Sequence, residues 1–560
     1  MEFLDARRLT GPSLLFDGPA AVMDVSCTVE EADRLERVWL AQVKRMNETL
    51  GWAQPEFSHQ SLSGGVSLAF TAAIDALYAA SEINEWAWAE CAAEFNGAER
   101  PDFEQTVADL KASAAEEANA SLLALQTASA ARDVTFLWDD DEASLGLGRS
   151  SNTWPVRKLP EVETINWDSY SDVPIGLVTG TNGKTTTVRL ATHILRVADL
   201  NVGLSSTDWI AVNDHIIERG DWSGPGGARA VLRQNEVDVA ILESARGGLL
   251  RRGLGVERAD AALITNIAED HLGDFGSQNL AELLDIKWIV SRAVREHGRL
   301  ILNADDNLLV GKSSTFPGEI VWFGLSGESE LVATHTKAGG LAFILDGDEL
   351  VKIENGEREL ICRNHEIPIA LGGAARHNVA NGLAAAALTW CLGSSLAEIR
   401  AGLTSMSQDE NPGRCNVYSI SDFKVLVDFA HNPHAMEALF DMSRALPAKR
   451  RLLAFAQAGD RTDASIRELA ESAWSIGLDA VVVSELEAYA RGREQGEVFG
   501  IIRDALIKSG ASEEQIAHYM EETESLDAAL DWAQPGDLVI MLALSARDEI
   551  QDKLKSLANL

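Results

Sequence analysis

Short apolar runs alternate with helical stretches from residue 174 onward. The first run covers residues 175–179, and further buried-strand runs lie at 238–242, 261–266 and 299–303. Strands separated by helices of crossover length are typical of a parallel sheet. We expect residues 319–370 to form short strands and turns, either as an insertion or at a sheet edge, and residues 377–391 to be helical.

A second alternating unit begins after the sequence Asn411-Pro412-Gly413. Its predicted strands lie near 424–428, 450–455, 479–483 and 538–543, which indicates a separate, Rossmann-like doubly wound domain. A Pro-Gly pair ends the preceding helix. We therefore expect a hinge near residues 408–413, on which the two units move.

The first 150 residues follow a different pattern. Thr28 and Glu31 form a capping box before an amphipathic helix, and further helices are expected at 66–95 and 104–127. These features leave two roles open for this region: it could serve in packing or oligomerisation, or it could recruit the substrate. A connector rich in Gly, Ser and Pro, residues 145–160, marks a boundary. The predicted fold is α/β, with a helical or α+β domain at 1–160, a P-loop domain at 161–410 and a C-terminal domain at 411–560.

Composition and charge limit the classes of binding partner and the cellular compartment that we expect. The chain has 560 residues and a net charge of -38, which argues against nucleic acid or an anionic membrane as the main partner. The five cysteines are scattered and lack a CxxC pair, which favours a reducing compartment. With no leader-like or membrane-length apolar stretch, the expected location is the cytoplasm.

The strongest chemical signal is the loop after the first predicted strand. Residues 179–187 read TGTNGKTTT. Glycines let backbone N–H groups approach phosphate oxygens, and the following helix directs its positive end toward them. Lys184 adds a positive charge, and Thr185 is placed to bind Mg²⁺. The loop residues expected to bind ATP are Gly180, Thr181, Asn182, Gly183, Lys184, Thr185 and Thr186.

This loop departs from the common Walker pattern, because Val178 stands where that pattern has glycine. The version found here resembles that of the Mur ligase family, and other segments extend the resemblance in family order. The block ESARGGLLRRGLG at 243–255 is similar to that of the ligase half of cyanophycin synthetases. The remaining matching segments are NIAEDHLG at 266–273, HNVAN at 377–381, NPGR at 411–414, DFAHNP at 428–433 and GDR at 459–461.

The resemblance implies the reaction. Members of this family convert a carboxylate to an acyl phosphate with ATP, and an amine then attacks it to form an amide. Cyanophycin synthetases also carry an ATP-grasp domain between a first domain and the Mur-like half. Segments 9–12 and 145–148 are similar to that first domain and its connector, yet the P-loop strand follows within about twenty-five residues, too few for a catalytic domain.

Roles for metal and catalytic residues follow from the same resemblance. Glu243 stands where a magnesium ligand belongs; its alternative is a helix cap or surface carboxylate. The resemblance assigns His271 to a second Mg²⁺, with a structural histidine as the alternative. It implies that Lys287 is carbamylated into a metal-binding carboxylate, whereas an isolated helical lysine is usually solvated. We expect Lys184, His271, Lys287 and Arg414 to be catalytic.

Further residues are assigned to nucleotide and substrate. Asn378 and Asn381 lie one helical turn apart, which suits adenine edges; capping by Asn378 is the alternative. Arg414 is expected to reach the γ-phosphate, and Asp428 to meet the ribose or to order Arg414. Strand-end positions and the arginine-rich block supply the expected substrate-binding residues, which are Arg246, His431, Asn432, Asp460 and Arg461. Pairing with surplus carboxylates is the alternative for Arg246, Arg251 and Arg252.

These expectations describe an ATP- and Mg²⁺-dependent ligase of a carboxylate acceptor and an amino acid or amine. The resemblance favours a basic amino acid joined to an acidic acceptor. A peptidoglycan- or folate-type ligase is the second hypothesis, and a nucleotide-binding scaffold without turnover is the third. We expect no nucleic-acid or membrane partner, and a homo-oligomer could form through the first domain.

Overall fold

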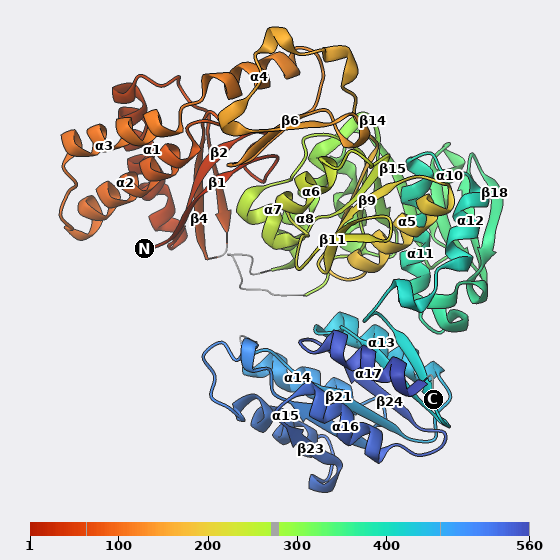
Figure 1. Cartoon of the computed structure of the whole chain (residues 1–560). Helices are drawn as coiled ribbons and strands as arrows, with labels where there is room; N and C mark the ends of the chain where they lie inside the picture. The colour runs from red at the N-terminus through yellow and green to blue at the C-terminus, as the bar shows by residue number, and fades with distance from the viewer. Residues whose placement is uncertain (63, 270–278, 460, 559–560) are drawn as a thin grey trace.

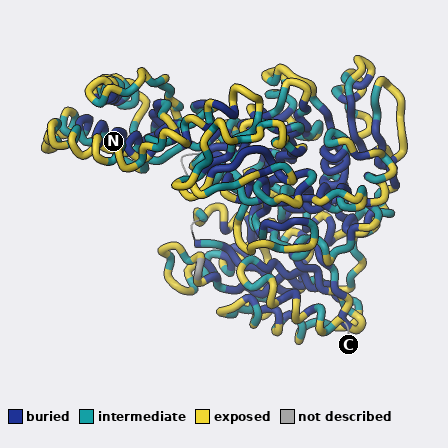
Figure 2. The backbone as a smooth tube through the Cα atoms, turned by 45° about the horizontal axis from the view of Figure 1, so that its top comes forward, coloured by how far each residue is buried: buried dark blue, intermediate teal, exposed yellow. Residues whose placement is uncertain are grey.

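A computed structural model describes residues 1–62, 64–269, 279–459 and 461–558. In Figure 1 the chain forms an N-terminal module, a central module beside it and a C-terminal module below the central one. Each module is built around one main sheet. Buried backbone concentrates in the strands and adjoining helices of each module (Figure 2). Within the described ranges, no helix is long and apolar enough to cross a membrane.

The N-terminal module is an antiparallel sheet in the order β1-β2-β4-β3, covered by helices. The Thr28–Glu31 capping box is present and starts α1. A small three-stranded sheet follows. The elements are β1 (Glu2–Leu9), β2 (Ala20–Ser26), α1 (Val29–Leu50), β3 (Phe57–Leu62), β4 (Gly65–Thr71), α2 (Leu77–Asn96), α3 (Phe103–Glu117), α4 (Ala120–Ala130), β5 (Phe136–Trp138), β6 (Glu142–Leu145) and β7 (Asn152–Pro155).

Two helix predictions in this module need correction. Residues 65–71 form the inner strand β4 and not the start of a helix, because their backbone pairs with β2 and β3 on both sides and their apolar side chains pack into the core. The helix expected at 104–127 divides into α3 and α4. Asn119 makes this division, because its side chain accepts the N–H of Leu122 as a new N-cap while its own N–H is bound by Asp75.

The central module is an eleven-stranded sheet in the order β11-β10-β9-β12-β8-β13-β14-β15-β16-β17-β18. Its middle strands, β9 to β16 in that order, run parallel, as predicted, and antiparallel strands lie at both ends. The strands are β8 (Ile175–Thr179), β9 (Val202–Ser205), β10 (Trp209–Val212), β11 (His215–Arg219), β12 (Val239–Glu243), β13 (Ala259–Ile264), β14 (Val294–Asn303), β15 (Glu319–Gly324), β16 (Leu341–Asp346), β17 (Glu349–Glu354) and β18 (Glu357–Arg363).

Helices cover both faces of this sheet, so its central strands are buried. One face packs α5 (Lys184–Val197), α11 (Arg376–Cys391) and α12 (Leu396–Ser405). The other packs α6 (Pro225–Leu232), α7 (Arg246–Arg252), α8 (Leu280–Trp288), α9 (Asn307–Lys312) and α10 (Glu330–Lys337). The region at 319–370 does contribute the sheet edge, through β17 and β18.

The C-terminal module is a six-stranded sheet in the order β19-β20-β24-β21-β22-β23, parallel except for β19, and its doubly wound form confirms the prediction. Helices α13, α14 and α15 cover one face, and α16 and α17 cover the other. The elements are β19 (Asn416–Ile420), β20 (Phe423–Asp428), α13 (Pro433–Ala445), β21 (Arg451–Phe455), α14 (Asp463–Trp474), β22 (Ala480–Ser484), α15 (Glu497–Lys508), β23 (Ile516–Tyr519), α16 (Glu522–Trp532), β24 (Leu538–Leu542) and α17 (Arg547–Ala558).

Candidate active site

The glycine-rich loop joins the buried strand β8 to helix α5. Two of its glycines have positive φ, 142° at Gly180 and 84° at Gly183. A Cβ on Gly180 would lie 1.9 Å from the Thr265 hydroxyl, and one on Gly183 would lie 2.3 Å from Oδ1 of Asn381. Lys184 opens α5, and its Nζ donates to the carbonyl of Thr181 at 3.0 Å. The glycines are therefore required both by backbone conformation and by space.

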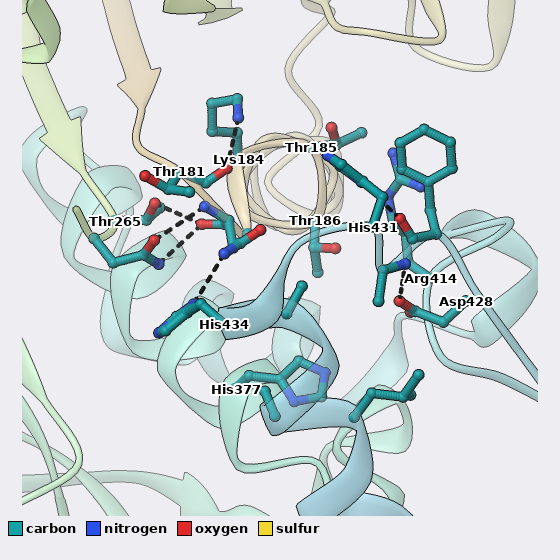
Figure 3. A pocket seen from close by; sticks show the side chains of 18 of the residues that line it. Thr181, Lys184, Thr185, Thr186, Thr265, His377, Arg414, Asp428, His431 and His434 are labelled. Carbon is teal, nitrogen blue, oxygen red and sulfur yellow. Dashed lines mark hydrogen bonds between the residues drawn. The ribbon is translucent and has the colours of Figure 1, made fainter. Parts of the chain in front are cut away.

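The loop is braced by the chain leaving β13. The carbonyl oxygen of Asn182 accepts hydrogen bonds from the hydroxyl of Thr265 at 2.6 Å and from Nδ2 of Asn266 at 3.0 Å. The N–H of Asn182 donates to Oδ1 of Asn266 at 3.0 Å. Figure 3 shows Thr265 beside the loop. These three hydrogen bonds hold the loop in shape without a bound nucleotide.

A buried carboxylate faces the first turn of α5. Glu243 ends β12, which pairs in parallel with β8, so the ends of both strands meet at one sheet edge. Its side chain is 2% exposed and accepts hydrogen bonds from Thr185 Oγ1 at 3.0 Å and Thr207 Oγ1 at 2.7 Å. The buried position excludes a surface role. Hydroxyl and carboxylate oxygens are ligands that Mg²⁺ prefers, with phosphate oxygens and water completing the set.

A lysine from α8 approaches the same loop. Lys287 is 4% exposed, and its Nζ donates to the carbonyl of Gly180 at 2.8 Å. It is therefore not a solvated helical lysine. Among the described residues, no group of three or more His, Cys, Asp and Glu gathers as a metal cluster. His271 and Asp460 lie outside the described residues.

Helix α11 packs against α5 and presents two asparagines to the cavity. Asn378 donates to the carbonyl of Ile369 at 2.9 Å and accepts from Nδ2 of Asn381 at 3.2 Å. The N-cap of the helix is Ala375, which makes no side-chain cap bond. Asn378 is thus not a cap; it and Asn381 form a hydrogen-bonded pair behind the phosphate loop.

The C-terminal module contributes the opposite wall. Arg414 lines the cavity, and its guanidinium lies 4.5 Å from the ring centroid of Phe429. Asp428 accepts the N–H of Cys415 and that of Ala430, both at 2.8 Å. The carboxylate therefore fixes the backbone directly after Arg414, at a residue whose φ is +54°. His431 also lines the cavity and contacts the carbonyl of Phe429 at 2.9 Å (Figure 3).

The two walls are joined by an amide pair. Nδ2 of Asn182 donates to Asn432 at 3.2 Å, and Nδ2 of Asn432 donates back to Asn182 at 3.0 Å. Asn432 is fully buried, caps α13 through the N–H of Ala435, and is not among the residues that line the cavity. Its contacts join the modules, which differs from the substrate contact expected from the sequence.

The walls enclose one cavity of about 980 Å³ between the central and C-terminal modules. Arg246 and Arg461 line it as well, whereas no described residue before 181 does. Arg252 instead donates to the carbonyl of Arg8 at 3.3 Å and so helps to hold the N-terminal module. The sequence-predicted loop, strand-end and Arg414 positions are therefore brought together from segments more than two hundred residues apart.

Two histidines and one cysteine in the cavity lining had no role predicted from the sequence. His434 contacts Nδ2 of Asn182 at 2.9 Å, and burial lowers the pKa of its ring. His377 contacts the Cys415 sulfur at 3.1 Å; burial lowers the pKa of His377 and raises that of Cys415. A Pro at the first position of α13 marks His434 as a first-turn residue, and the HNVAN segment contains His377. Nothing in the sequence pairs His377 with Cys415.

Comparison with known proteins identifies the central and C-terminal modules. The Mur ligase middle domain matches residues 178–389, and the Mur ligase, glutamate ligase domain matches residues 413–543. A cyanophycin synthetase from Nostoc sp. is 35% identical over 383 residues, covering 68% of this chain and 42% of the relative. One from Crocosphaera subtropica is 34% identical over 379 residues, covering 67% and 43%. The chain spans less than half the length of these relatives.

Proteins of lower sequence identity are also similar to this chain. The UDP-N-acetylmuramoyl-tripeptide–D-alanyl-D-alanine ligase of Escherichia coli is 28% identical over 271 residues, covering 47% of this chain and 56% of that protein. The structure of E. coli FolC in complex with DHPP and ADP has a TM-score of 0.50 at 19% identity, covering 68% of this chain and 89% of FolC, and shares the fold. The chain therefore belongs to the Mur ligase family of ATP-dependent, ADP-forming acid–amino acid ligases.

Proposed function

We propose that this chain uses ATP to join the carboxyl group of an acidic acceptor to the amine of a basic amino acid. One observation carries the proposal: the phosphate loop with Lys184 and Thr185 faces Arg414, from the other module, across a single cavity. Phosphoryl transfer needs cations around the γ-phosphate from more than one side. A cavity closed by two modules also keeps water from an acyl phosphate.

The reaction has two steps. A carboxylate oxygen of the acceptor attacks the γ-phosphorus, the bond to the β,γ-bridging oxygen breaks, and ADP leaves. The amine nitrogen then attacks the acyl carbon, loses a proton to solvent, and expels inorganic phosphate. Lys184 binds the phosphates through the first step, and Arg414 offsets the charge gathered when two anions approach each other.

Magnesium is the cation that suits the central site. Thr185 and Glu243 would hold it, and it would supply positive charge between the phosphate oxygens when bound. We propose that His271 takes part in a second metal site. Lys287 is proposed to become a carbamate through CO₂, and this idea is supported by its burial and by its position against the phosphate loop.

The remaining cavity residues divide between nucleotide and substrates. Asn378 and Asn381 are proposed to meet the adenine, and Asp428 the ribose; all three line the cavity. Substrate carboxylates are assigned to Arg246 and Arg461, which are cationic and line the same cavity. His431 and Asp460 are proposed to complete the substrate side. The contacts of Asn432 support a role in holding the phosphate loop instead.

The substrate class rests on the 243–255 block and on relatives that are named cyanophycin synthetases. The test is a phosphate-release screen of single amino acids against aspartate-containing peptides, with mass spectrometry of the products. A new amide with arginine or lysine would support the proposal. Products with neutral or acidic amino acids only would contradict the substrate class while leaving the ligase reaction standing.

A nucleotide-binding scaffold without turnover is the alternative function. ATP binding without phosphate release in every substrate combination would favour it. We further propose domain boundaries near residues 160 and 410, which are compatible with the two matched ranges, and a homo-oligomer formed through the N-terminal module. Light scattering on the whole chain and on a chain lacking residues 1–160 tests the oligomer.

A further inference from the structure

Three arginines converge on one aspartate at the junction of the central and C-terminal modules. Asp208 lies in the turn between β9 and β10 and is 8% exposed. Its carboxylate lies 2.6 Å from Nη2 of Arg189, on α5, and 2.5 Å from Nη2 of Arg547, the first residue of α17. Nη2 of Arg414 lies farther away, at 3.7 Å. We call these four residues the Asp208 cluster.

The cluster has a surplus of positive charge. Burial opposes ionisation of Asp208, yet Arg414, Arg189 and Arg547 outweigh that effect and lower the pKa of its carboxyl. One carboxylate therefore pairs with three guanidinium groups in a site closed to most solvent, and Glu243 acts on Arg189 as a second, more distant negative charge. A polyanion in the adjacent cavity would supply the negative charge that the cluster lacks.

Arg547 and Arg189 are held on several sides. A Cβ on Gly413 would lie 2.2 Å from Cδ of Arg547, so the arginine packs directly on the Pro-Gly turn. Arg189 donates to Oδ1 of Asn411 at 3.2 Å and to the carbonyl of Pro412 at 3.3 Å. Both arginines thus fix the segment that leads into Arg414.

A second buried carboxylate fixes the backbone of the three residues that precede Arg547. Glu522 is 2% exposed and accepts the N–H groups of Leu544, Ser545 and Ala546 at 2.7 to 2.9 Å. These are the three residues before Arg547, and their N–H groups precede the first turn of α17. The position of Arg547 against Asp208 is therefore set by the C-terminal module itself.

Arg414 differs from its two neighbours. It is the arginine of the cluster that lines the cavity, and it is the one farthest from the carboxylate. Its guanidinium also rests on the Phe429 ring, which Arg547 approaches at 5.4 Å. An arginine held at this distance can turn to a phosphate oxygen without leaving Asp208 unpaired, because Arg189 and Arg547 remain.

We propose that Asp208 is a positioning residue of the ligase: it binds Arg189 and Arg547 as a link between the modules and thereby presents Arg414 to the terminal phosphate of ATP. This inference rests on the proposed function and adds a residue of the central module that acts through another side chain. Arg547 attaches the C-terminal module to Asp208, and Arg414 is the side chain that this attachment positions.

A double-mutant cycle in phosphate release tests the link. Asp208→Asn is expected to lower kcat on the order of 10²-fold, since misplacement by about 1 Å costs that much. The KM for ATP should stay unchanged or fall, because a carboxylate that competes with phosphate for Arg414 has been removed. In an Arg414→Ala background, Asp208→Asn should have little further effect. Equal fold losses in both backgrounds, or wild-type kcat in Asp208→Asn, would overturn the proposal.

A matched control separates positioning from general damage. Asp537 is likewise buried and paired with an arginine, Arg450. It precedes β24, however, and so lies at the opposite end of that strand from Leu544. Asp537→Asn should reduce thermal stability while leaving kcat near the wild-type value. A loss of kcat in Asp537→Asn as large as in Asp208→Asn would mean that removing any buried carboxylate has this effect.

Hydrogen exchange gives a readout that does not need turnover. In the nucleotide-free protein, Asp208→Asn should speed amide exchange at 411–417 and 547–550, and Asp537→Asn should not. Unchanged exchange at these segments in Asp208→Asn would refute the link. A wild-type chain that binds ATP but releases no phosphate would refute the ligase proposal instead, and the exchange comparison would still decide the role of Asp208.

Discussion

Substituting Gly183 by alanine should weaken ATP binding by an amount that the structure allows us to estimate. Gly183 has φ 84° and ψ -6°, in the left-handed region. A side chain there costs about 1–2 kcal/mol. The new Cβ would also lie 2.3 Å from Oδ1 of Asn381, whose amide is bonded to Asn378. Displacing Asn381 loses that bond, which is worth about 1 kcal/mol.

The combined cost of the alanine side chain is therefore about 2–3 kcal/mol, and the free protein avoids this cost by moving the phosphate loop. Because ATP binding requires the original loop shape, the same free energy is lost from binding, which weakens it by roughly 30- to 150-fold at 1.4 kcal/mol per factor of ten. The assay is titration calorimetry with a non-hydrolysable ATP analogue, alongside denaturant unfolding. Binding within threefold of the wild type would show that the loop tolerates the Cβ and would refute the reasoning.

A matched control isolates the contact from the backbone. Gly496 is the N-cap of α15, with φ 79° and ψ -6°, and a Cβ there meets nothing within 4 Å. Gly496→Ala should thus show only the cost of the left-handed conformation and no change in ATP binding. If both variants lost stability equally and both bound ATP normally, Asn381 would not restrict the loop.

Other predictions test individual roles. Lys184→Ala should abolish phosphate release without unfolding, which circular dichroism checks; near wild-type turnover would refute the phosphate contact. Lys287→Ala should lose activity that bicarbonate does not restore, whereas a small carboxylic acid rescues part of it; full activity would exclude a carbamate. Burial lowers the pKa of His377 below 6.5, so the unfolded chain binds the extra proton and stability falls as the pH drops through 6.5. His377→Gln should then reduce the loss of melting temperature between pH 7.5 and pH 5, and an unchanged loss would mean that His377 titrates normally. ATP with acceptor should lower the radius of gyration in small-angle scattering if residues 408–413 form a hinge; an unchanged radius would argue against it.

Much of the fold could be predicted because its signals are local. The apolar run of β8, the glycines after it and the start of α5 are neighbours in the sequence, so the phosphate loop follows from a few residues. The same holds for the strand ends at Glu243 and Asp428. The error at β4 has the opposite cause, because residues 65–71 are a strand only through pairing with β2 and β3 on both sides.

The sequence by itself determined the parallel sheets, the nucleotide loop and some of the charged residues near it, such as Lys184, Glu243 and Arg414. The tertiary structure decided which residues meet, including several that the sequence did not indicate. Asn182 and Asn432 pair across 250 positions, and Asp208 collects arginines from α5, the Pro-Gly turn and the start of α17. Such contacts leave no periodic trace, because a polar residue in a loop satisfies local rules equally well whether it faces water or a distant partner. Only when one module packs on the other is water excluded from these side chains, and only then is the distant partner selected.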